Sequence, residues 1–276
     1  MIGEIASFSN ALANAFTNTL GGKSTQITSW RNTLRASSSI AMAIISVVIL
    51  FNLNTITLQV VLIGIAAGFI GGLGLPFIYK AISTGAVSFV SPVVALTQSL
   101  FLILFAVIVK NESLSVTFPI AAALGGLGIY LCSRPTAGNQ KITWQSFFLA
   151  ASAATFFSGF SFLMTEIENS KILGALFGAR IGVFCLTFIF PPKNKVSRAN
   201  GYAKYALLSG TFEVVANMFF LIAINNLDLS KVGIFMASAP ALASLIGIKL
   251  LHQKPSITNW LGIAASTAAL AIIALN

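Results

Sequence analysis

Long apolar segments alternate with short polar breaks along the whole chain, and each segment is about long enough for one membrane-crossing helix. Crossing ~30 Å of hydrocarbon takes ~20 mostly apolar residues in an α-helix. The pattern predicts ten such helices, at residues 3–21, 32–51, 58–79, 86–109, 115–133, 144–164, 172–191, 204–224, 230–250 and 257–275. Polar residues or an arginine interrupt the first and the seventh. The breaks are too short for a water-soluble domain, so the predicted fold class is an all-α integral membrane protein.

The composition supports a chain that is surrounded by lipid. Hydrophobic residues make up 57% of the chain and charged residues only 8%, whereas soluble domains carry roughly 25% charged residues. The formal net charge of +10 would suit a nucleic-acid partner, but the basic residues are scattered and form no dense patch, which excludes that class. Cys132 and Cys185 stand apart and give neither a disulfide framework nor a metal-ligand spacing, so no metal and no cofactor are expected.

A weak internal repeat divides the predicted helices into two sets of five. A shift of 142 residues, without a gap, places Phe77 on Phe219, Ala81 on Ala223, Ser88 on Ser230, Val90 on Val232, Ala95 on Ala237, Leu100 on Leu242 and Ala122 on Ala264. We therefore expect a duplication, with one five-helix repeat at residues 1–136 and another at 137–276. An odd number of helices makes the second repeat enter the membrane from the opposite side. Such inverted repeats are common among secondary transporters.

The basic residues are distributed unevenly between the two sets of predicted loops. The loops after odd-numbered helices, with their flanking helix ends, hold twelve Lys and Arg residues, and those on the other side hold three. Cytoplasmic loops carry the excess of Lys and Arg in membrane proteins. This bias places the odd-numbered loops in the cytoplasm and both termini outside.

A glycine-rich run from Gly68 to Pro76 lies inside an apolar segment and lacks the lysine of a phosphate-binding loop. Small residues let the backbones of neighbouring membrane helices approach closely. We therefore interpret this run, and Gly125 and Gly126 in the fifth helix, as packing surfaces.

Two stretches share one pattern, in which a helix ends in an Ala-Ile pair, a short turn follows, and the next helix contains a proline. One runs from Phe77 through Ala81, Ser88 and Pro92 to Glu112, and the other from Phe220 through Ala223, Ser230 and Pro240 to Trp260. With Arg35 and Arg180 in the second and seventh helices, the chain resembles the ten-helix EamA-type members of the drug/metabolite transporter superfamily. The resemblance implies a carrier that exports amino acids or related compounds, with helices one, three, four, six, eight and nine around a central cavity.

Glu213 lies about midway along the eighth helix, and Asn217 follows one turn later on the same face. Ionisable groups inside the membrane are costly and mark substrate or ion pathways. A proton on Glu213 would exchange against a substrate, or its carboxylate would bind a substrate ammonium. The alternative is a structural role, in which Glu213 neutralises Arg180 or hydrogen-bonds to an amide across the bundle. We take Glu213 as the candidate for coupling and for substrate binding.

A row of amides, Asn10, Asn14 and Asn18, recurs at every fourth residue of the first helix and therefore occupies one face. Since this face would be unstable towards lipid, we expect Asn10 and Asn14 either to line a cavity or to bond to a neighbouring helix. Gln98 and Pro240 occupy equivalent positions in the two repeats. Proline frees a backbone carbonyl by interrupting the helix, and glutamine offers a side-chain amide at the equivalent level. Both are therefore candidates for the same cavity, although Pro240 alone would also serve to kink its helix.

Other functional classes fit the sequence less well. An enzyme would need a catalytic histidine, a carboxylate cluster or a metal, and the single histidine, His252, has no evident partner. A channel would show rings of charge or a carbonyl filter. The sequence thus predicts a multi-pass secondary transporter of the cell membrane, which is the inner membrane if the source is a Gram-negative bacterium. It moves a small polar metabolite by alternating access. Protons are the candidate coupling ion, and a channel or a non-transporting scaffold or receptor is the alternative.

Overall fold

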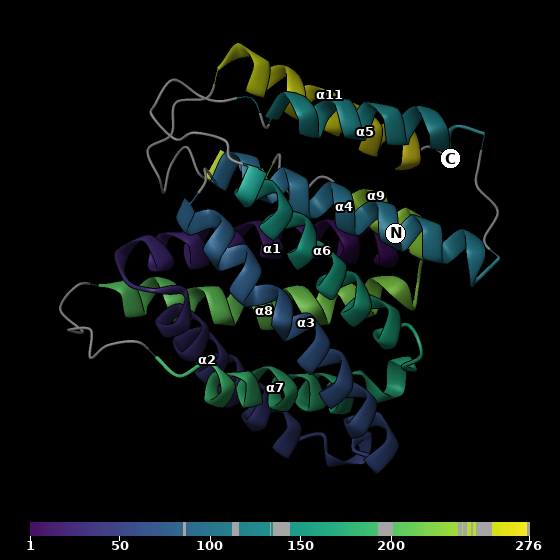
Figure 1. The fold of residues 1–276 in the computed structure, drawn as a ribbon. Helices are drawn as coiled ribbons and strands as arrows, with labels where there is room; N and C mark the ends of the chain where they lie inside the picture. The colour runs from purple at the N-terminus through teal and green to yellow at the C-terminus, as the bar shows by residue number, and fades with distance from the viewer. Residues whose placement is uncertain are drawn as a thin grey trace.

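The computed structural model describes residues 1–84, 87–111, 116–132, 134, 144–192, 201–236, 239, 242–243, 245–246 and 256–274. Over these residues the chain is helical and contains no strand (Figure 1). The α-helices are α1 (Ile2–Ile27), α2 (Trp30–Leu50), α3 (Leu58–Thr84), α4 (Val87–Ile108), α5 (Phe118–Cys132), α6 (Trp144–Met164), α7 (Ile172–Ile189), α8 (Tyr202–Ile224), α9 (Leu229–Met236) and α11 (Ile257–Ala274). Two short 3-10 helices are η1 (Leu53–Thr55) and η2 (Asn169–Lys171). The predicted all-α fold class is confirmed.

The helix ends follow the predicted spans closely, with clear differences in α1 and in α3, which continues to Thr84 instead of ending at 79. The span predicted at 3–21 continues to Ile27, so the predicted end was wrong. The hydroxyl groups beyond it are satisfied without breaking the helix. Thr25 donates to a carbonyl one turn earlier at 2.9 Å, and the Ser24 hydroxyl lies 3.0 Å from that of Thr33 in α2.

Five of the described helices are long and apolar enough to cross a membrane. They cover Trp30–Leu50, Leu58–Ile82, Trp144–Met164, Ile172–Ile189 and Tyr202–Ile224. Large apolar side chains such as Val47, Leu62 and Phe188 are exposed on their outer surfaces, where lipid is the matching solvent. These helices make the chain a multi-pass membrane protein.

Helices that are far apart in the sequence pair tightly in the bundle. α1 packs along α8, α3 lies against both α6 and α7, α2 contacts α7 and α8, and α5 pairs with α11 (Figure 1). An inverted duplication would exchange the pair α1–α8 with α6–α3, and the pair α3–α7 with α8–α2. The packing is what such a duplication would produce, and the division near residue 136 stays a prediction.

α3 and α7 approach each other so closely that their contact requires glycine. A Cβ atom on Gly68 would lie 2.0 Å from the carbonyl oxygen of Ala179, and one on Gly178 would lie 2.3 Å from that of Val61. Gly64 and Gly182 lie equally close to the opposite backbone. The interpretation of the run that begins at Gly68 as a packing surface is confirmed. The same interpretation of Gly126 in α5 was wrong, because no described atom lies within 4 Å of a Cβ placed there.

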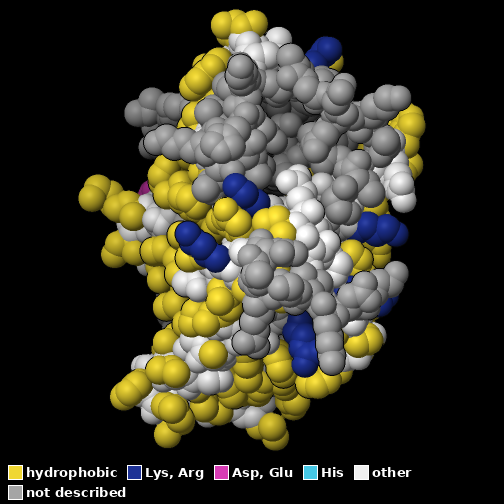
Figure 2. All heavy atoms as spheres, turned by 90° about the vertical axis from the view of Figure 1, so that its left-hand side faces the viewer, with side chains coloured by type: hydrophobic (Ala, Val, Ile, Leu, Met, Phe, Trp, Pro, Cys, Tyr) yellow, Lys and Arg dark blue, Asp and Glu magenta, His cyan; other side chains and the backbone are white. Residues whose placement is uncertain are grey.

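The helix ends and the chain termini gather at two opposite ends of the bundle. α1 ends and α2 begins at the left of Figure 1, where α7 also ends and α8 begins, whereas both chain termini lie towards the right. Figure 2 looks onto the left-hand end and shows Lys and Arg side chains spread among apolar ones. The described part of the chain therefore carries basic residues at the end where the sequence places the odd-numbered loops. The cytoplasmic location of that end stays a prediction.

Candidate functional site

A cavity of about 110 Å³ lies among the helices. A single water needs roughly 10–15 Å³ on the same measure, so several waters or a small solute fit inside. Its described polar lining residues are Asn10, Asn14, Thr17, Asn18, Ser91, Gln98, Ser161, Arg180, Glu213 and Asn217. They come from α1, α4, α6, α7 and α8, and α3 and α9 add glycine and apolar residues. The six helices that the family resemblance implied all take part, and α7 joins them.

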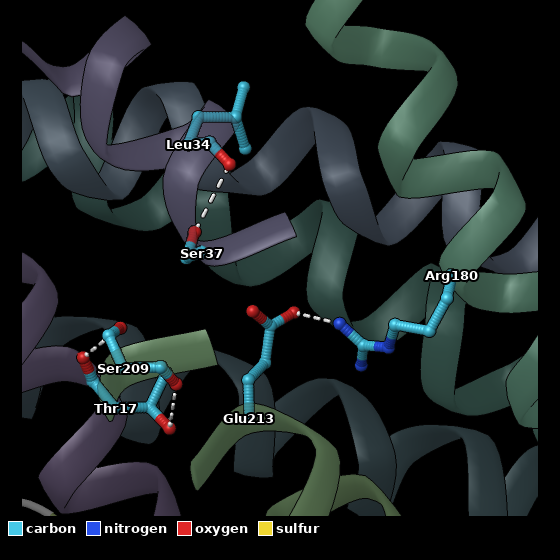
Figure 3. Close-up of polar contacts among 6 residues, drawn as sticks. All are labelled: Thr17, Leu34, Ser37, Arg180, Ser209 and Glu213. Atoms are coloured by element: carbon cyan, nitrogen blue, oxygen red, sulfur yellow. Dashed lines mark hydrogen bonds and ion pairs between the residues drawn. The ribbon is translucent and has the colours of Figure 1, made fainter. Parts of the chain in front are cut away.

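Glu213 and Arg180 form an ion pair inside this cavity. Arg180 Nη1 lies 2.6 Å from Glu213 Oε1, and the two side chains are 2% and 13% exposed. Figure 3 shows them reaching towards each other from α8 and α7. One further atom of each group, Arg180 Nε and Glu213 Oε2, has no hydrogen-bond partner among the described residues. The ion pair that the sequence offered as the alternative for Glu213 is therefore present, and it leaves a donor and an acceptor unused.

The row of asparagines divides into two roles. Asn10 is buried, and its Nδ2 donates to the backbone carbonyl of Ala216 in α8 at 2.7 Å. Its Oδ1 is buried and has no partner among the described residues. Asn14 and Asn18 are half-buried and line the cavity. The amide face thus turns inward, and Asn10, itself a lining residue, joins α1 to α8.

A second polar contact holds α1 against α8 beside the cavity (Figure 3). The Ser209 hydroxyl donates to the carbonyl of Thr17 at 2.9 Å, and the Thr17 hydroxyl donates to the carbonyl of Ser209 at 3.4 Å. Tyr79 of α3 is buried next to them, its ring 2.8 Å from where a Cβ on Gly21 would lie. Interhelical hydrogen bonds of this kind contribute about 0.6–1.7 kcal/mol each in membranes. Together they fix the position of the asparagine face.

Residues 144–275 match the EamA-like transporter family. This EamA-like domain begins at α6 and supplies both members of the ion pair, whereas the asparagine row lies outside it. The match covers 132 of the 276 residues and is to a family of transporters. A crystal structure described only as that of a protein matches over 99% of this chain and 96% of its own, with a TM-score of 0.76 and 18% identity. At that identity the likeness shows the fold alone, and no curated protein matches in sequence.

Of the remaining candidates from the sequence, two line the cavity and the third lies outside the described residues. Asn217, inside the EamA-like domain, and Gln98, on α4, both line the cavity and are half-buried. Pro240 lies outside the described residues. Its described neighbours Ala239 and Ala243 line the cavity.

The sequence reasoning gave several lining residues no role in a cavity. Arg180 appeared there only as a family feature and as a partner for Glu213, although an arginine inside a span is as strong a signal as an acid. Three phenylalanines, Phe157, Phe160 and Phe220, also line the cavity. Aromatic residues are too common in this chain for sequence alone to single them out. Among the described residues no cluster of three or more His, Cys, Asp or Glu could hold a metal.

Proposed function

We propose that the protein is a secondary transporter that exports a small polar metabolite, an amino acid or a related compound, by alternating access. The observation that carries the proposal is a polar cavity whose lining comes from helices of both predicted repeats. Transporters with inverted repeats bind their substrates at such an interface near the midplane. The amides of Asn14, Gln98 and Asn217 would bind the polar groups of the solute, and the phenylalanine rings would contact its apolar part.

The packing of the helices supports a rocking motion around this cavity. Asn10 and Ser209 bond α1 to α8, and glycine contacts join α3 to α7. α7 and α8 carry the two ends of the ion pair but contact each other little. The α1–α8 pair would therefore move as one body against the α3–α7 pair, with the solute between them.

Glu213 is the candidate for proton coupling in this proposal. To accept a proton, the Glu213 carboxylate would have to give up its ion pair with Arg180. A charged group of a bound solute would then pair with the residue that lost its partner. Protonation and solute binding would in this way compete for the same carboxylate.

The test is uptake of labelled amino acids, amines and carboxylates into proteoliposomes, with and without an imposed pH gradient. Saturable uptake that the gradient stimulates is expected, and Glu213→Gln should remove the stimulation. Saturable uptake that ignores the gradient would refute proton coupling and leave a facilitated carrier. Uptake that does not saturate would indicate a channel, and no uptake of any compound would favour the scaffold or receptor alternative.

A further inference from the structure

The charges of the cavity cancel each other. Among its described lining residues, Arg180 and Glu213 are the charged ones, and they are paired at 2.6 Å. The other polar lining groups are amides and hydroxyls. A solute that enters therefore meets an environment without net charge.

Four polar atoms at the cavity are buried without a partner among the described residues. Arg180 Nε is a donor, Glu213 Oε2 and Asn10 Oδ1 are acceptors, and the Ser91 hydroxyl is both. Buried polar atoms are normally hydrogen-bonded in proteins. Once a side-chain movement brings them to the cavity surface, a solute with both donors and acceptors would satisfy them, or water would. A solute with only one kind of group would leave some of them unsatisfied.

A solute with a net charge faces a different energetic problem. Charge is costly in a region of low dielectric constant unless an opposite charge lies beside it. Here each protein charge already has its partner in the other. A monovalent cation would be attracted by Glu213 and repelled by Arg180 at nearly the same distance, and an anion would experience the reverse.

We propose that the Arg180–Glu213 pair sets the charge selectivity of the cavity, so that it accepts solutes without net charge and rejects monovalent organic cations and anions. The inference rests on the proposed function in one respect, that the cavity is where the solute binds. It names Arg180, which the sequence analysis gave only as a family feature and as a partner for Glu213, as a residue that determines specificity. A pair that only braced α7 against α8 would give no such dependence on the sign of the solute.

The test uses three probes with the same phenyl body and different charge: 2-phenylethylammonium, phenylacetate and the neutral phenylacetamide. Their binding to the purified full-length protein is measured by titration calorimetry at pH 7. Wild type should bind phenylacetamide most tightly. Arg180→Gln leaves a lone carboxylate and should shift preference towards the cation, and Glu213→Gln should shift it towards the anion. Each shift should be roughly 10- to 100-fold, the range for a hydrogen bond to a charged group.

The double variant Arg180→Gln/Glu213→Gln has no unpaired charge and should return to the neutral probe. It also serves as a control for folding, because removing one partner of a buried ion pair is strongly destabilising whereas removing both is not. If the single variants are too unstable for titration, thermal unfolding gives the same answer, since a bound probe raises the Tm. Arg180→Lys keeps the charge and should keep the wild-type preference.

Three results would overturn the proposal. They are a wild type that binds either ion as tightly as the amide, single variants whose preference does not follow the sign of the remaining charge, and single variants that bind no probe. Binding is measured here without transport. If the protein binds the probes with the expected charge selectivity but transports no compound into proteoliposomes, the proposed transport function is refuted and the charge selectivity of the cavity is not.

Discussion

Gly178 faces α3 at a distance that leaves no room for a side chain. A Cβ atom there would lie 2.3 Å from the carbonyl oxygen of Val61 and 3.1 Å from the Cα of Gly64. These are backbone atoms, so Gly178→Ala should force α3 and α7 apart. Gly178 is not among the residues that line the cavity, and the effect should therefore appear in stability before it appears in binding.

The expected size follows from the overlap. Carbon and carbonyl oxygen meet at about 3.3–3.6 Å even in the closest favourable contacts, so the helices would have to separate by roughly 1 Å. Overpacking of this kind costs about 1–3 kcal/mol. At roughly 2–4 °C per kcal/mol for a chain of this size, the Tm should fall by about 2–12 °C relative to a glycine replaced in open space.

Gly126→Ala in α5 is the matched control, because no described atom lies within 4 Å of a Cβ placed on Gly126. Both substitutions gain the same helix propensity, up to ~1 kcal/mol, so their difference isolates the contact. The assay is thermal unfolding of the purified protein in detergent, followed by tryptophan fluorescence and by recovery of monodisperse protein. Equal Tm values for the two variants would refute the close contact between α3 and α7.

Two further predictions follow from the described contacts, and a third follows from the predicted membrane orientation. Asn10→Ala removes the amide that donates to α8 at 2.7 Å, and should cost about 0.6–1.7 kcal/mol, seen as a Tm lower by roughly 1–7 °C. Lys110 donates to Glu166 at 2.7 Å and thereby lowers the pKa of that carboxyl. The stabilisation is present above the usual Glu pKa of about 4.3 and is lost as the pH falls through the lowered pKa of the folded protein. Lys110→Met should therefore lower the Tm at pH 7, and progressively less as the pH falls below the usual Glu pKa. In a background without the native cysteines, Asp228→Cys should react with a membrane-impermeant maleimide on intact cells, and Lys204→Cys only after permeabilisation.

Each of these predictions has its control. Asn226→Ala removes an exposed amide that bonds only within its own helix turn, and a loss equal to that of Asn10→Ala would contradict the interhelical role. The Lys110–Glu166 pair is largely exposed, so its effect should stay below about 1 kcal/mol and weaken in high salt. A Tm difference that stays as large below the usual Glu pKa as it is at pH 7 would assign the loss to packing instead of charge. The reverse labelling pattern would place both termini in the cytoplasm.

The helices could be predicted from the sequence because each apolar segment is bounded by polar residues or turns. α6 begins and ends at the predicted residues 144 and 164. The end of α1 could not be predicted in the same way. Its last turns are polar, and they stay helical because Ser24 meets Thr33 across the α1–α2 turn, a contact that exists only once α2 is in place.

The site could be predicted in its chemistry but not in its pairing. The asparagine spacing alone indicates an inward face, whereas the bond from Asn10 to α8 depends on which helix is the neighbour. The glycines were the residues whose packing role could be predicted least well from the sequence. Gly68 and Gly126 look alike in sequence, yet one lies against the α7 backbone and the other meets no described atom within 4 Å. Only the packing of the bundle distinguishes them.

The pairing of α1 with α8 and of α3 with α7 has a consequence for how the chain is made. The ribosome completes α1 and α3 long before α7 and α8 emerge, and until then the amide of Asn10 and the bare backbone at Gly64 and Gly68 have no partner from the second half. The first half must therefore wait in the bilayer in an unfinished state. Two separately synthesised halves should each be degraded alone and accumulate when produced together, since each covers the surfaces that the other leaves open.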